Sequence, residues 1–239
     1  MEKIKKLKKI LSKELIDGYL IPKNDEFFDE YVSNQNDRLN YISNFTGSFG
    51  LSLILKDKNL LFVDGRYTLQ ALKQSGKFFD IITIPGKMPS DVLKNKKLNI
   101  GFDPKLFTKK SLYIFFKKNM CKLKPININL IDKIWKRNKA RINKNFYILP
   151  TQSVGDNYKS KIKKISTILN KNGADYQFIT ASENNAWLLN IRGRDSEYSP
   201  LPFSYILVDK HKNIKFFCDL KKIPSYFKRY FKKVQFISL

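Results

Sequence analysis

The feature that most constrains this 239-residue chain is a pattern that occurs twice along it. The matching stretches keep the same order in both halves: 17–21 with 174–179, 41–47 with 187–193, 52–58 with 204–210 and 61–64 with 216–219. Each copy runs from an apolar segment, through a glycine loop, to a pair of apolar segments that ends in Asp. An internal repeat of this length predicts two copies of one domain in tandem.

Helix and strand patterns alternate in both copies, which predicts an α/β fold with a mixed sheet flanked by helices. The first helix is expected over residues 2–15, where the apolar side chains form one stripe: Ile4, Leu7, Ile10, Leu11 and Leu15. A basic amphipathic helix can lie on a membrane, but the buried strand expected at 19–21 favours packing on a sheet. Hairpins are expected at 51–63 and at 203–218.

The domain boundaries follow from the repeat. We expect domain I over residues 1–137, an irregular basic linker over 138–154 and domain II over 155–239. In domain I, further strands are expected at 79–84, 97–102 and 125–130, and a helix at 108–119. Domain II has only a helix near 225–230 and a strand at 234–237 after its hairpin, so we expect it to be truncated, with an exposed sheet edge and apolar surface.

The charge balance is strongly basic, with 46 Lys and Arg against 21 Asp and Glu. The 46 basic residues are 39 Lys and only 7 Arg, spread along the whole chain. Specific nucleic-acid recognition depends mainly on Arg, so we expect no specific nucleic-acid partner. No apolar run is long enough to cross a membrane, and two cysteines are too few for a disulfide framework. We therefore expect a reduced, cytoplasmic protein with no membrane partner.

The residues alone provide no complete catalytic group. The single histidine, His211, lies in a predicted hairpin turn, so neither a metal site nor a Ser-His-Asp arrangement is expected. Four acidic residues are candidates for acid–base chemistry without a pattern that pairs them: Asp29, Glu30, Asp37 and Asp64. Arg66 follows Asp64 at a strand-to-helix turn. It either forms an ion pair with Asp64 or Glu30, or faces a ligand.

Several motifs together resemble the Xaa-Pro aminopeptidase (aminopeptidase P) family of three-domain type. In the first copy they lie at 29–31, Arg38, 42–48, 64–67, 70–71, 100–104 and 132–135. In the second copy the stretch 186–195, Ala-Trp-Leu-Leu-Asn-Ile-Arg-Gly-Arg-Asp, followed by Pro200, is similar to the middle domain of that family. The resemblance covers nearly the whole chain and implies two creatinase-type N-terminal domains.

The resemblance implies a metallopeptidase, a hydrolase that removes the N-terminal residue from peptides with proline in second position. In the family this chemistry belongs to a C-terminal pita-bread domain that binds two divalent metals, usually manganese, and that domain is absent here. The chain alone is therefore expected to lack a cofactor and to be inactive. Its expected partners are the C-terminal catalytic domain, or a split chain that carries it, and short Xaa-Pro peptides.

The resemblance also places Arg66 and its neighbour Tyr67 near the substrate entrance, where they would recognise substrate without taking part in catalysis. Shaping of the cleft and assembly are the expected roles of the two domains, and a homo-oligomer is a further alternative. The competing hypothesis is a stand-alone module, or pseudoenzyme, that binds peptides or proteins without hydrolysing them.

Overall fold

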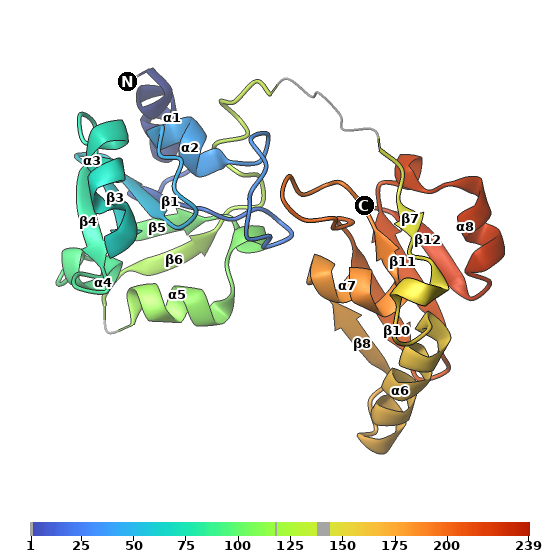
Figure 1. The fold of residues 1–239 in the computed structure, drawn as a ribbon. Coiled ribbons are helices and arrows are strands. Elements are labelled where there is room, and N and C mark those ends of the chain that lie inside the picture. Colours follow the sequence, from blue (N-terminus) through green and yellow to red (C-terminus); the bar gives the residue numbers. More distant parts are fainter. Residues whose placement is uncertain (1, 118, 138–143) are drawn as a thin grey trace. The chain divides into compact units, whose positions relative to one another are not determined.

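The structure, a computed structural model, describes residues 2–117, 119–137 and 144–239 (Figure 1). The chain divides into two compact units. The first comprises Met1–Glu26 and Asn34–Lys139, and the second comprises Phe27–Ser33 and Ala140–Leu239. The short segment Phe27–Ser33 thus belongs to the second unit, where the Phe27 ring stacks on Phe203 with 4.6 Å between centroids.

The first unit is built on a six-stranded sheet with the order β4-β3-β2-β1-β5-β6. Its strands are β1 (Gly18–Pro22), β2 (Leu51–Leu55), β3 (Asn59–Asp64), β4 (Asp80–Ile84), β5 (Asn99–Phe102) and β6 (Lys122–Pro125). The pairs β1–β2 and β2–β3 are antiparallel, whereas β3–β4, β1–β5 and β5–β6 are parallel. The predicted α/β class with a mixed sheet is confirmed.

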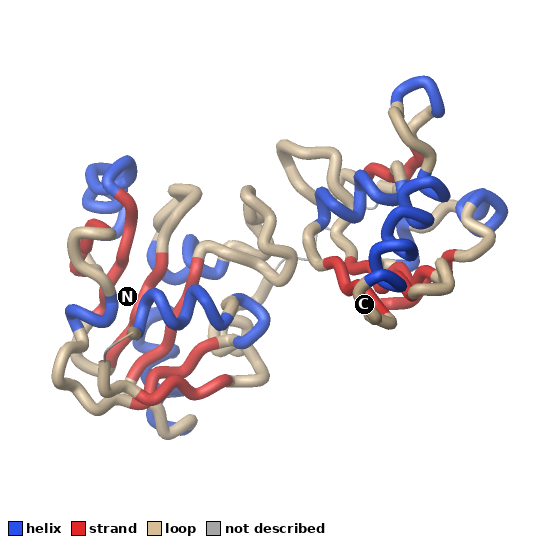
Figure 2. Tube along the Cα trace, turned by 90° about the horizontal axis from the view of Figure 1, so that it is seen from below, coloured by secondary structure: helices blue, strands red, loops and turns tan. Residues whose placement is uncertain are grey.

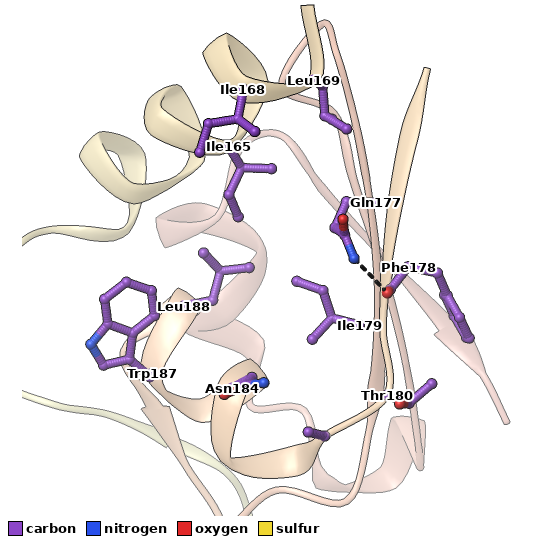
Figure 3. A pocket seen from close by; sticks show the side chains of 11 residues that line it. Ile165, Ile168, Leu169, Gln177, Phe178, Ile179, Thr180, Asn184, Trp187 and Leu188 are labelled. Carbon is purple, nitrogen blue, oxygen red and sulfur yellow. Dashed lines mark hydrogen bonds between the residues drawn. The ribbon is translucent and has the colours of Figure 1, made fainter. Parts of the chain in front are cut away.

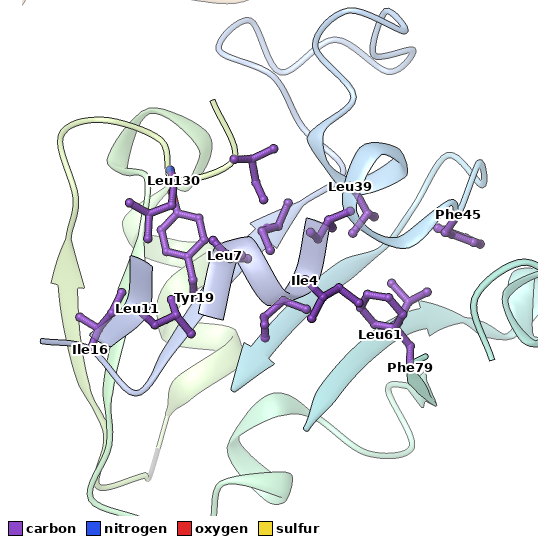
Figure 4. Packing of buried hydrophobic residues seen from close by; sticks show 14 of the residues in the cluster. Ile4, Leu7, Leu11, Ile16, Tyr19, Leu39, Phe45, Leu61, Phe79 and Leu130 are labelled. Carbon is purple, nitrogen blue, oxygen red and sulfur yellow. The ribbon is translucent and has the colours of Figure 1, made fainter. Parts of the chain in front are cut away.

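Helices cover both faces of this sheet, because the strands are apolar on both sides (Figure 2). The helices are α1 (Glu2–Lys13), α2 (Arg38–Ser43), α3 (Thr68–Ser75), α4 (Pro89–Val92) and α5 (Lys109–Phe116), with 3₁₀ turns η1 (Gly65–Tyr67) and η2 (Pro104–Leu106). Tyr19 and Ile21 of β1 pack toward α1, α2 and α3, where Leu7 and Leu11 are fully buried (Figure 4). Leu20 packs toward α4 and α5 on the other face.

The second unit repeats this plan with fewer strands. Its sheet has the order β12-β11-β10-β8, and a separate two-stranded sheet joins β7 to β9. Its elements are β7 (Tyr147–Ile148), η3 (Thr151–Ser153), α6 (Tyr158–Lys171), β8 (Tyr176–Ile179), α7 (Ser182–Leu189), β9 (Ile191–Arg192), β10 (Tyr205–Asp209), β11 (Ile214–Cys218), η4 (Leu220–Lys222), α8 (Ser225–Tyr230) and β12 (Val234–Ser238). The core lies between α6, α7, α8 and the sheet.

Three local expectations were wrong. The strand expected at 125–130 is β6, which ends at Pro125, because the residues after it turn inward and bury Leu130 and Ile131. Leu15 leaves the helical stripe: α1 ends at Lys13, and Leu15 adopts a φ of 55° with 80% of its surface exposed. The region expected to be an irregular linker contains strand β7, and Phe146 beside it is buried. Residues 138–143 of that region lie outside the described residues.

Candidate functional site

The turn that follows β3 presents Arg66 to solvent on a short, well-anchored loop. The carboxylate of Asp64 accepts the backbone N–H of Arg66 at 2.9 Å and its guanidinium Nη2 at 2.7 Å. The side chain of Arg66 is 75% exposed and that of Asp64 is 24% exposed. Hydrogen bonding from Arg66 lowers the pKa of Asp64, so the pair is charged at neutral pH. Within the first unit, Arg66 therefore has Asp64 as its ion-pair partner, one of the two partners considered for it.

Tyr67 connects this turn to the glycine loop at 46–50. The Arg66 guanidinium lies over the Tyr67 ring, 5.4 Å from its centroid, and the hydroxyls of Tyr67 and Ser48 share a hydrogen bond of 2.7 Å. The Tyr67 ring also meets the edge of Phe45 at 5.9 Å. The ring of Phe45 lies so close to Gly47 that a Cβ there would be 2.2 Å from it. Glycine is therefore required where the loop crosses this ring.

A group of side-chain amides extends the same polar surface. Gln74 accepts the backbone N–H of Thr46 at 3.0 Å, and the amide nitrogens of Gln70 and Gln74 both donate to the Thr46 hydroxyl at 2.9 Å. Together with Arg66 and Tyr67, these groups offer one cation and several neutral donors and acceptors. Such a surface can bind and orient a polar or anionic group, but it holds no base–nucleophile pair for covalent chemistry.

The other acidic candidates have structural contacts. Asp37 begins α2, where it accepts the Asn40 N–H at 2.9 Å and forms a buried ion pair with Lys23. Asp29 accepts the N–H of Glu30 at 3.0 Å. Within the first unit, Asp37 pairs with Lys23 and Asp64 pairs with Arg66, so neither carboxylate is paired with the other for acid–base chemistry.

Among the described residues of the first unit, Arg38 is the most deeply buried cation, at 3% exposure. It donates to both carboxylate oxygens of Asp132 at 2.8 and 2.9 Å and to those of Glu26 at 2.6 and 3.3 Å. Burial disfavours its charge, but the hydrogen bonds that the guanidinium donates to these two carboxylates outweigh burial and raise the pKa of Arg38. Arg38 and Asp132 both occur in the motifs noted above. Their contact gives these two motif residues a structural role, the pairing of two distant parts of the first unit.

Metal-ligating side chains do not converge in the described parts of the chain. Over residues 2–117, 119–137 and 144–239, no group of three or more His, Cys, Asp or Glu side chains could hold a metal ion. His211 lies in the hairpin turn between β10 and β11, where Asp209 accepts its backbone N–H at 2.9 Å. Among the helices that the structure describes, none is both long and apolar enough to span a bilayer.

In both units a lysine of the first helix contacts an aromatic residue, which the sequence did not predict. Lys3 of α1 donates to the carbonyl of Tyr41 at 2.9 Å and lies 4.4 Å from the centroid of its ring. Lys161 of α6 donates to the carbonyl of Trp187 at 2.6 Å and lies 4.1 Å from its ring. Tyr41 and Trp187 occupy matching positions of the repeat, so the sequence already pointed to the two rings. No sequence pattern pointed to the two lysines that contact them.

Comparison with known proteins also divides the chain near residue 137, although it leaves residues 27–33 with the first part. The family described as "Creatinase/Prolidase N-terminal domain" matches residues 3–134, and a second family with the same description matches residues 137–238. Xaa-Pro aminopeptidase 1 of Dictyostelium discoideum is 32% identical over 93% of this chain and 38% of its own length. Aminopeptidase P2 of Arabidopsis thaliana is 31% identical over 87% of this chain and 31% of its own length.

A solved structure is similar over the whole chain. The X-prolyl aminopeptidase of Caenorhabditis elegans, described as a cytosolic enzyme with a di-nuclear active site, matches 99% of this chain with a TM-score of 0.91 and 27% identity. The match covers 42% of that enzyme. The chain therefore spans between about a third and two fifths of the length of these relatives.

Proposed function

The chain belongs to the creatinase/prolidase N-terminal domain family, and from this we propose that it serves as the non-catalytic N-terminal region of an Xaa-Pro aminopeptidase. The observation that carries the proposal is the match to X-prolyl aminopeptidases across both units of the chain. In this proposal the reaction's two divalent metals, expected to be manganese, are held by the family's C-terminal catalytic domain. A cytoplasmic location is part of the same proposal.

Within this region, Arg66 and Tyr67 recognise the substrate. The guanidinium is held by Asp64 on one side and exposed on the other, so it can pair with a carboxylate of a short peptide. The ring of Tyr67 packs against the guanidinium, and the hydrogen bond between the hydroxyls of Tyr67 and Ser48 holds that ring in place. Because Asp64 and Tyr67 already hold the guanidinium, binding would not have to order a flexible side chain.

A chimera tests the proposal. The present chain replaces the matched 38% of the Dictyostelium enzyme, and hydrolysis of an Xaa-Pro tripeptide is measured with manganese for the chimera and for residues 1–239 alone. We expect activity in the chimera and none in the chain alone. Hydrolysis by the chain alone, or an inactive chimera that is folded and contains metal, would refute the proposal.

Variants of the chimera test the site. Arg66→Ala removes the exposed charge, and we expect KM to rise about tenfold, the cost of one charge-assisted hydrogen bond, with kcat and metal content unchanged. Arg229→Ala is the matched control, because Arg229 is an exposed arginine of α8 in the second unit. An equal effect of both substitutions would mean that net charge, and not the position of Arg66, determines substrate binding.

A further inference from the structure

The two units share a lysine–aromatic contact between α1 and α2 in the first unit and between α6 and α7 in the second. Lys3 with Tyr41 in the first unit makes the same two contacts as Lys161 with Trp187 in the second. The helices α2 and α7 also end alike, since Asn44 and Asn190 both adopt the left-handed conformation, with φ of 63° and 55°. The first unit is therefore an internal template for what should cover each surface of the second.

In the first unit, the groove between α1, α2 and β1 is filled from within the chain. The ring of Trp135 stacks on Tyr41 with 4.6 Å between centroids, and Ile126, Leu130 and Ile131 are buried in the same cluster. Strand β5 pairs in parallel with β1 along the edge beside this groove. Two segments thus close this side: one strand at the edge and one apolar stretch, residues 126–135, over the helices.

In the second unit, the corresponding groove is open. The side chains of Ile165 and Ile168 of α6, Ile179 of β8 and Leu188 of α7 line it, with Trp187 at its rim (Figure 3). Its volume is about 480 Å³. Trp187 is 59% exposed and Ile168 is 58% exposed. Apolar side chains of this size are normally covered, so the groove has the character of a binding surface.

The edge of the sheet beside the groove is open as well. In the described part of the second unit, strand β8 is the outermost strand of its sheet, and it pairs there with β10 alone. The N–H of Lys210 donates to the carbonyl of Asp175 at 3.0 Å, and the antiparallel register continues with Gln177 opposite Val208. Because bonding alternates along an antiparallel pair, the backbone groups of Tyr176 and Phe178 point away from β10. They match Gly18 and Leu20, which lie on the strand that pairs with β5.

We propose that the β8 edge and this groove bind a polypeptide segment from outside the 239 residues, with one extended strand parallel to β8 and one apolar stretch packed on Trp187, Ile165 and Ile168. The first unit supplies the argument for this occupant, since β5 and residues 126–135 fill the matching positions there. A second copy of the chain is disfavoured by repulsion, because residues 140–239 carry 18 Lys and Arg against 7 Asp and Glu. The segment should therefore be uncharged or acidic.

Hydrogen exchange at β8 tests this inference, which rests on the internal repeat and not on the proposed function. We compare residues 1–239 with the Dictyostelium chimera, in which further chain is present. The outward amides of Tyr176 and Phe178 should exchange about 100-fold more slowly in the chimera, because a paired strand opens far less often than an edge. Equal exchange in the two proteins would overturn the inference, whether or not the chimera hydrolyses peptides.

Matched variants locate the contact. Ile168→Glu places a charge in the groove and should abolish the protection of β8 in the chimera, while leaving the melting temperature of residues 1–239 unchanged. Thr167→Glu is the control, since Thr167 is its exposed neighbour and bonds only to the carbonyl of Lys163 in its own helix. Loss of protection in both variants would overturn the inference.

A second variant addresses the strand itself. Phe178→Pro removes an outward N–H without removing a bond to β10, so it should block strand addition in the chimera, whereas Phe178→Ala should not. Sedimentation of residues 1–239 completes the test, and we expect a monomer. A dimer with protected β8 amides would show that a second copy is the occupant, contrary to the inference.

Discussion

Replacing Arg38 by methionine should destabilise the first unit strongly. Arg38 is 3% exposed and makes four hydrogen bonds to Asp132 and Glu26. Removing one member of a buried ion network leaves the remaining charges without the partner that offset their desolvation, at a cost of about 3–5 kcal/mol. Asp132 keeps its contact with Arg137, which places the expected loss toward the lower end of that range.

The chain allows this loss to be measured for one unit alone. It contains two tryptophans, Trp135 in the first unit and Trp187 in the second. In a Trp187→Phe background, Trp135 fluorescence during urea unfolding therefore reports on the first unit. With a slope of about 2 kcal/mol per molar urea, a loss of about 3 kcal/mol lowers the midpoint by about 1.5 M.

A lysine variant separates charge from geometry. Arg38→Lys keeps the positive charge but cannot form the forked contacts with both carboxylates, so we expect a smaller loss of about 1–2 kcal/mol. A loss below about 1 kcal/mol for Arg38→Met, with an unchanged slope, would refute the reasoning. It would mean that Asp132 and Glu26 are solvated well enough without Arg38.

Three further predictions concern other contacts. Asp17→Asn should cost about 1 kcal/mol at pH 7, because Asp17 accepts the N–H of Asn99 and the ammonium of Lys56, both at 2.9 Å. These bonds lower the pKa of Asp17, so the stabilisation by its carboxylate is present above about pH 4 and is lost as the pH falls through the folded-state pKa. The free energies of urea unfolding of wild type and variant should therefore become equal at low pH. A difference that stays constant with pH would contradict the assignment. Burial raises the pKa of Cys218 to about 12, so iodoacetamide should alkylate Cys218 in urea but not in the folded chain, as peptide mass spectrometry can show. Lys161→Met should destabilise the second unit by about 1–3 kcal/mol, because Lys161 is 4% exposed and donates hydrogen bonds to the Trp187 carbonyl and to Asn190. Trp187 fluorescence during urea unfolding, in a Trp135→Phe background, measures this loss. An unchanged unfolding midpoint would refute the stabilising role of Lys161.

The architecture was predictable because its signals are local. Strand and helix periods, turn residues and the internal repeat are all properties of neighbouring residues, and they correctly placed β2, β3, α8 and the hairpin between β10 and β11. The ion pair of Arg66 with Asp64 was one of the alternatives that the sequence offered, since the two residues are two positions apart. The role of Arg66 and Tyr67 in substrate recognition stays a prediction.

The register of the repeat could not be obtained this way. The sequence repeat aligned Leu53 with Tyr205. In the structure, Leu20 pairs with Leu53, and Phe178, which takes the place of Leu20 in the second unit, pairs with Leu207. The structure therefore aligns Leu53 with Leu207. The two alignments differ by two residues. A shift of two leaves every side chain on the same face of a strand, so the apolar pattern cannot detect it. Only the pairing with the neighbouring strand determines the register.

The sequence by itself therefore determined the fold class and the duplication, because these depend on patterns within short segments. The tertiary structure decided which distant residues meet. Arg38 contacts Asp132 across 94 positions, and Trp135 covers Tyr41 while its counterpart surface at Trp187 stays open. Such contacts depend on how the strands are ordered in the sheet, and no local pattern records that order.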